Sequence, residues 1–173
     1  MAMQVLEAGG IPILTDKLRK ADSNNLKGYY EYEPVKQMMQ GNIQWLAKAE
    51  GKAVKIVSPL LFYLPKDYTY RIIFMQRDLG EVLRSQNKML ELQNKKSTPT
   101  NDEAMRLFYE NHLQKVTTWL EAQNNIQTLY LGYRDVVDRP DPAVGLINQF
   151  LGGKLNAKKM AIAVNPALYS QRT

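Results

Sequence analysis

Short apolar runs predict strands at several points along the chain. Residues 53–57, 70–75 and 126–131 are rich in β-branched and aromatic side chains, which pack well in sheets. Residues 11–14 form a weaker candidate for a short edge strand, because the proline within them has no amide hydrogen for a ladder. Strands that alternate with helices are typical of an α/β layer fold with a mostly parallel central sheet.

Apolar residues recur at helical spacing around these strands. The predicted helices cover residues 1–8, 34–40, 78–92, 143–151 and 156–164, with a helical piece around 45–49 and a long helix that opens at Thr100. The first helix has a glycine stop signal at Gly9-Gly10 but no start signal. Two pairs resemble capping boxes and mark helix starts, namely Asp78 with Glu81 and Thr100 with Glu103.

The long helix carries an apolar stripe that is expected to face the core. Its members are Met105, Leu107, Phe108, Leu113, Val116 and Leu120. Residues 138–142 predict a turn before the next helix, because two prolines and two aspartates gather there.

Composition places the chain among ordinary globular proteins. Its 173 residues carry a formal net charge of +6, with 45% apolar and 23% charged residues. This length predicts a single domain over residues 1–173. No apolar run approaches the roughly 18 residues that a membrane-spanning helix needs, so we expect no membrane partner and a cytoplasmic location.

The chain has no cysteine, and His112 is its single histidine. Disulfides, thiolate ligands and cysteine nucleophiles are therefore excluded, and so is a site with several histidine ligands. We expect no metal cofactor.

The residues that follow each strand are the best candidates for ligand binding, since ligands bind at the carboxyl ends of parallel strands. Arg77 follows the strand 70–75 and directly precedes a predicted helix start, and Ser85 lies eight positions later, about two turns into that helix. A guanidinium beside free helical amides is a natural site for phosphate or sulfate. Alternatively, Arg77 pairs with Asp78 or Glu81 on the surface and Ser85 is an ordinary helix serine.

Two other strand ends carry polar side chains. Ser58 follows residues 53–57, but no histidine is near it in the sequence, so a serine-hydrolase interpretation is poor. Residues 133–135, Tyr-Arg-Asp, follow the strand 126–131 and could equally be structural. Neither Gly51-Lys52 nor Gly153-Lys154 has the preceding glycine of a Walker-type phosphate loop.

Several segments together resemble the P-loop sulfotransferase-like family. They are residues 4–10, 25–31, 73–85, 131–135 followed by the prolines at 140 and 142, and 147–152. The resemblance implies a three-layer fold with P-loop NTPase-like topology and 3′-phosphoadenosine-5′-phosphosulfate (PAPS) as the sulfonate donor. The Arg77–Ser85 pair matches the pair with which the family holds the 3′-phosphate of PAPS.

The resemblance also suggests further binding residues. Arg172, in the tail, could add a cation at the 3′-phosphate, although a frayed terminus is the alternative. Tyr29 and Tyr30, with Tyr32, could line a pocket for the acceptor, or they could simply pack beneath the long loop 15–33. Glu31, beside them, is a candidate for binding the acceptor, and Glu31 or Glu33 is a weak candidate for the catalytic base.

The sequence departs from the family in two places. The first strand and the glycine-rich loop that binds the 5′-phosphosulfate are missing, so we expect an N-terminally incomplete domain that needs this loop for activity. Its sheet edges would then favour association with a partner or a second copy. Secondly, many members have a histidine base at the end of the strand matching 53–57, where this chain has Ser58. His112 is expected in a helix remote from any strand end, as an ordinary residue.

The implied function is transfer of a sulfonate group from PAPS to a hydroxyl or amine of a small-molecule acceptor. The alternative is a non-catalytic relative that binds a nucleotide or a polyanion. Nucleic acid is a poor candidate, because the basic doublets Lys95-Lys96 and Lys158-Lys159 are scattered and lack interleaved aromatic residues.

Overall fold

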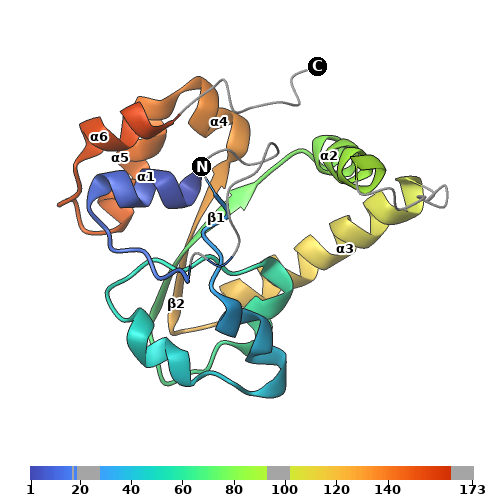
Figure 1. The fold of residues 1–173 in the computed structure, drawn as a ribbon, viewed down its shortest axis with the longest axis horizontal. Coiled ribbons are helices and arrows are strands. Elements are labelled where there is room, and N and C mark those ends of the chain that lie inside the picture. The colour runs from blue at the N-terminus through green and yellow to red at the C-terminus, as the bar shows by residue number, and fades with distance from the viewer. Residues whose placement is uncertain (17, 19–27, 93–101, 165–173) are drawn as a thin grey trace.

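A computed structural model describes residues 1–16, 18, 28–92 and 102–164, and the fold is drawn in Figure 1. The helices and strands are α1 (Ala2–Gly9), β1 (Tyr70–Gln76), α2 (Leu79–Leu92), α3 (Asp102–Glu121), β2 (Ile126–Gly132), α4 (Tyr133–Asp138), α5 (Pro140–Phe150) and α6 (Ala157–Ala163). Three 3₁₀ helices precede β1, namely η1 (Glu33–Gln40), η2 (Gln44–Ala49) and η3 (Ser58–Tyr63). The prediction of a mixed α/β chain is confirmed.

The two strands pair in parallel, and their register determines what meets at their ends. Tyr70 lies opposite Ile126 at one end of the ladder, and Gln76 lies opposite Gly132 at the other. The strands predicted at 70–75 and 126–131 are therefore confirmed as neighbours in one small parallel sheet. Both carboxyl ends lie at the same edge, so the residues after Gln76 and Gly132 emerge side by side.

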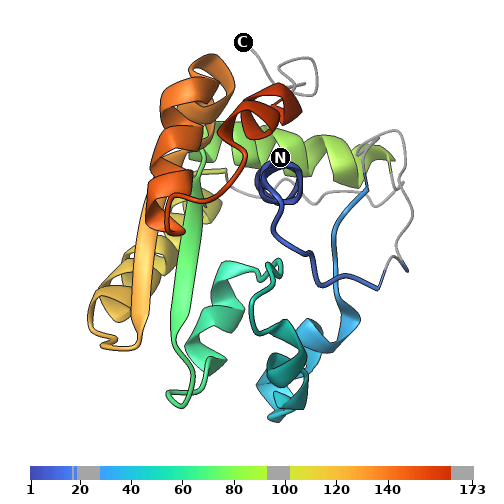
Figure 2. The same cartoon turned by 90° about the vertical axis from the view of Figure 1, so that its left-hand side faces the viewer.

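Each face of this sheet packs against its own apolar core. Ile72 and Phe74 of β1 contact a core that includes Val116 of α3. Ile73 and Met75, the alternate positions, contact a second core that includes Met160 of α6. Figures 1 and 2 show the strands between α1, α5 and α6 on one side and α3 on the other. Alternation of side chains along a strand thus holds helices on both faces of the sheet.

The strand predicted at 53–57 is wrong in the described structure. Only Ala53 forms a bridge, parallel to Ile13, in which Leu14 donates to the Ala53 carbonyl at 2.9 Å and Ala53 donates to the Pro12 carbonyl at 2.9 Å. Beyond this bridge the Asp16 N–H donates to the Glu31 carbonyl at 3.3 Å, so the next donor of the partner segment does not pair with residues 55–57.

The prediction that the apolar stripe of the long helix faces the core is only half correct. Val116 and Leu120 are buried, whereas Leu107 and Phe108 are 57% and 63% exposed. A helix of 20 residues spans about 30 Å, and the first half of α3 extends past the sheet towards α2, as Figure 1 shows. Only its second half reaches a core.

The predicted starts of α5 and α3 have different outcomes. Residues 138–142 do not form a separate turn, because α4 ends at Asp138 and α5 begins at Pro140, which is tolerated in the first turn of a helix. Thr100, the predicted cap of the long helix, lies outside the described residues.

Candidate functional site

The carboxyl edge of the sheet gathers polar side chains from both strand ends. Arg77 follows β1 and Tyr133 follows β2, directly beyond the paired residues Gln76 and Gly132. The guanidinium carbon of Arg77 lies 5.1 Å from the centroid of the Tyr133 ring. This contact is a cation–π interaction, so the register of the two strands places a cation against an aromatic face.

Glu81, in the first turn of α2, accepts hydrogen bonds from two arginines. Its backbone N–H donates to Asp78 Oδ1 at 3.0 Å, which confirms the predicted cap of α2. Its side chain does not complete a capping box, because Oε2 accepts from Arg77 Nε at 3.2 Å. Oε1 accepts from Arg134 Nε at 2.8 Å and from Nη2 at 2.5 Å. We call these three residues the Arg77–Glu81–Arg134 cluster.

Burial differs sharply within the cluster. The side chain of Glu81 is 0% exposed, that of Arg77 is 28% exposed and that of Arg134 is 57% exposed. A buried carboxylate is strongly unfavourable unless charged donors compensate it, and two guanidinium groups do so here. The cluster therefore brings two guanidinium groups together on one carboxylate at the carboxyl edge.

Of the expected donor-binding residues, the structure brings Arg77 to this edge and leaves Arg172 outside the described residues. Ser85 is half-buried on α2, one turn beyond Glu81. The alternative that Arg77 pairs with Glu81 also holds, but the pair is formed with a buried carboxylate and not on the surface.

The tyrosine segment is attached to α1 by Tyr30. The Tyr30 hydroxyl donates to Glu7 Oε2 at 2.7 Å, and its backbone has a φ of 52°, which is unusual for a bulky residue. Burial and the neighbouring Glu7 carboxylate raise the pKa of Tyr30 to about 12. Tyr30 is therefore protonated at neutral pH and does not serve as a base.

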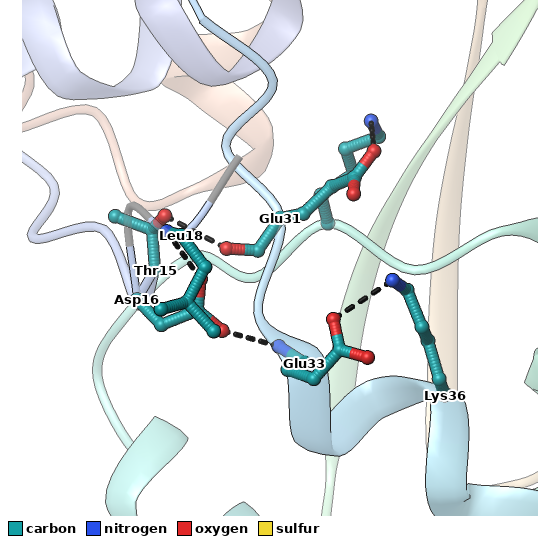
Figure 3. Close-up of polar contacts among 7 residues, drawn as sticks. Thr15, Asp16, Leu18, Glu31, Glu33 and Lys36 are labelled. Atoms are coloured by element: carbon teal, nitrogen blue, oxygen red, sulfur yellow. Dashed lines mark hydrogen bonds and ion pairs between the residues drawn. The ribbon is translucent and has the colours of Figure 1, made fainter. Parts of the chain in front are cut away.

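Polar contacts fix the following residues in place, as Figure 3 shows. Thr15 Oγ1 donates to the Glu31 carbonyl at 2.8 Å, and the Glu33 N–H donates to Asp16 Oδ2 at 2.5 Å. Lys55 Nζ lies 3.7 Å from Glu31 Oε1, so the carboxylate of Glu31 faces a cation. Residues 31–33 are thus held between the 15–16 segment and Lys55.

Further contacts bear on the roles of this segment. Hydrogen bonds from the backbone N–H groups of Glu33 and Leu18 lower the pKa of Asp16, which stays ionised. Tyr32 packs edge-on against Trp45, with 5.7 Å between ring centroids, so this tyrosine has a packing role. The Tyr29 carbonyl accepts a hydrogen bond from Lys55 Nζ at 3.1 Å.

Ser58 and His112 form a pair that the sequence analysis missed. Ser58 Oγ lies 2.9 Å from His112 Nε2, and both side chains are half-buried. The expectation that Ser58 has no histidine nearby is therefore wrong, whereas His112 does lie in a helix, α3, as predicted. The two residues are 54 positions apart, and only the packing of α3 against η3 brings them together.

Local sequence signals could have found the other missed contacts only in part. The spacing of Asp78 and Glu81 indicated a helix start, and Arg134 was visible as a residue beyond a strand end. Nothing in the sequence indicated that the carboxylate of Glu81 would turn towards Arg134, because this contact depends on the pairing of β1 with β2.

Within the part of the chain that the structure describes, no three or more His, Asp or Glu side chains are placed to hold a metal ion. Likewise, none of the described helices combines the length and apolar character needed to cross a membrane.

An α/β chain with a parallel sheet and arginines at its carboxyl edge is suited to binding an anionic group. The profile of the family described as Sulfotransferase domain matches residues 20–171. The chain therefore belongs to the sulfotransferase domain family. Neither a curated protein nor a solved structure matches it significantly.

We predict that Glu81→Ala lowers the free energy of unfolding by about 1.5–3 kcal/mol, because it removes the charged hydrogen bonds that join two guanidinium groups to one buried carboxylate. Urea denaturation measures the change. The matched control is Glu110→Ala, which removes a half-exposed partner of Arg106 on α3 and is expected to cost less than about 1 kcal/mol. Equal losses in the two variants would contradict a special role of Glu81.

Proposed function

We propose that this chain forms the core of a PAPS-dependent sulfotransferase, which transfers a sulfonate group from PAPS to a hydroxyl or amine of a small acceptor. Its full fold would be the three-layer fold of that family. The observation that carries the proposal is the position of Arg77, at the carboxyl end of β1, where the family places its donor-phosphate arginine. Membership of the family supports the same conclusion.

On the donor side, Arg77 and Ser85 bind the 3′-phosphate. The first turn of α2 lies between them, and its partial positive charge favours an anion. Tyr133 contacts the guanidinium of Arg77 through its ring face and so helps to hold that group in place. Arg172 is proposed as a further cation on the same phosphate.

On the acceptor side, we assign Tyr29, Tyr30 and Glu31. The ion pair with Lys55 fixes the carboxylate of Glu31, and the hydroxyl of Tyr30 is held by Glu7. Groups with fixed positions lower the entropic cost of orienting an acceptor.

The transfer requires a proton acceptor. The acceptor oxygen attacks the sulfur of the donor, the bond from sulfur to the bridging phosphate oxygen breaks, and the acceptor proton must leave. Histidine is the side chain that most often acts as a general base, and His112 is the single histidine of the chain. We assign His112 Nε2 as the base that takes up this proton. The proton reaches Nε2 through the Ser58 hydroxyl, whose oxygen lies 2.9 Å from it.

The family's glycine-rich loop for the 5′-phosphosulfate has no counterpart among the glycine motifs of this sequence. The proposal therefore concerns the donor and acceptor groups that residues 1–173 contribute, and full activity requires such a loop.

Arg77→Ala is expected to weaken binding of adenosine 3′,5′-bisphosphate by about tenfold or more, because a charge-assisted hydrogen bond to phosphate is lost. Isothermal titration calorimetry of the chain gives the dissociation constants. Arg106→Ala, which removes a half-exposed arginine of α3, is the control and should bind within twofold of the wild type. Lack of binding by the wild type, or equal binding by both variants, would overturn the donor site.

His112→Gln is expected to slow sulfonate transfer by about 10²–10⁴-fold, because glutamine can hydrogen-bond to Ser58 but cannot take up the proton. The rate is measured with PAPS as donor and 2-naphthol as acceptor, in a protein that carries the glycine-rich loop ahead of residue 1. Binding of adenosine 3′,5′-bisphosphate should remain within twofold, which controls for folding. A transfer rate within threefold of the wild type would rule out His112 as the base.

A further inference from the structure

We propose that Arg134 is a second cation on the donor 3′-phosphate, and that Glu81 is the positioning residue that aligns Arg134 with Arg77. The inference rests on the proposed function and adds to it a residue that the resemblance to the family did not indicate. It assigns the Arg77–Glu81–Arg134 cluster to one phosphate monoester.

The geometry brings two guanidinium groups to one place. Arg77 follows the last residue of β1, and Arg134 is the second residue after β2, where the two strand ends are paired. Both arginines donate to the carboxylate of Glu81, one to each of its oxygens. A single carboxylate as shared partner keeps both groups close to the same small ligand.

The charge balance requires the second arginine. A phosphate monoester carries a charge of about −1.5 to −2 at pH 7. Glu81 accepts hydrogen bonds from both arginines, so one guanidinium alone does not balance both this carboxylate and a bound phosphate. Arg134 is the more exposed of the two arginines, with 57% of its side chain exposed, and it shares the carboxylate of Glu81 with Arg77.

Arg139 provides an internal contrast. It lies five positions after Arg134 and donates from Nη2 to Asp135 Oδ1 at 2.7 Å. Both members of that pair are exposed, and neither contacts Glu81 in the described structure. The pair is neutral and stands on the surface, so removing Arg139 changes the net charge of the protein without changing the cluster.

The role of Glu81 follows from its burial. The cap of α2 fixes its backbone through Asp78, and its side chain is 0% exposed. A fully buried carboxylate does not reach a bound phosphate, which it would also repel. Glu81 acts instead by fixing the orientation of two guanidinium groups. Donors that are already oriented lose less entropy when a ligand binds.

The test is isothermal titration calorimetry of the full chain with adenosine 3′,5′-bisphosphate and, separately, with 5′-AMP, which lacks the 3′-phosphate. Arg134→Met is expected to weaken binding of the bisphosphate about tenfold or more, since it loses a charge-assisted contact. Binding of 5′-AMP should change less than about twofold. Arg139→Met, the control with the same change in charge, should bind both nucleotides within twofold of the wild type.

The assignment is overturned if Arg134→Met binds the bisphosphate as the wild type does, or if binding of both nucleotides falls equally. Because Arg134 also compensates the buried Glu81, this variant can lose stability. Arg134→Lys keeps a positive charge near Glu81 but loses the planar fork, and it should bind the bisphosphate about three- to tenfold more weakly. Wild-type binding by a folded Arg134→Lys variant would equally overturn the assignment.

The outcomes separate this inference from the proposed function. A wild-type chain that binds no bisphosphate, or an Arg77→Ala variant that binds it normally, overturns the donor site and the inference with it. If Arg77→Ala weakens binding of the bisphosphate and Arg134→Met does not, only the role of Arg134 is overturned.

Discussion

The buried negative charge of Glu81 is the constraint on which the carboxyl edge of the sheet depends. An ionised carboxylate without exposure to water requires cationic partners, and these come from the ends of both strands. The strand ends are therefore fixed relative to each other and to the start of α2. The same contacts hold two guanidinium groups at the edge where ligands of parallel sheets bind.

The two apolar cores explain why this edge is well defined. β1 packs one set of side chains against α3 and the alternate set against α1 and α6, so the strand cannot shift by one residue without exchanging its two faces. That register places Gln76 opposite Gly132, and the arginines follow from it. Core packing thus determines the geometry of the proposed phosphate site, and α3 carries His112 to Ser58 in the same way.

Local patterns in the sequence predicted the elements better than the contacts between them. β1, β2 and the cap at Asp78 were predictable because each depends on residues that are neighbours in sequence. The strand at 53–57 was wrong because a strand also needs a partner with free donors. The Ser58–His112 pair and the turn of Glu81 towards Arg134 were not predictable, since both join residues more than 50 positions apart.

The most direct test of the account is a crystal structure of the chain with adenosine 3′,5′-bisphosphate. The account predicts that oxygens of the 3′-phosphate lie within hydrogen-bond distance of the guanidinium groups of both Arg77 and Arg134, with Glu81 still bound to both. A 3′-phosphate bound away from this edge, or held by Arg77 while Arg134 points to solvent, would contradict it.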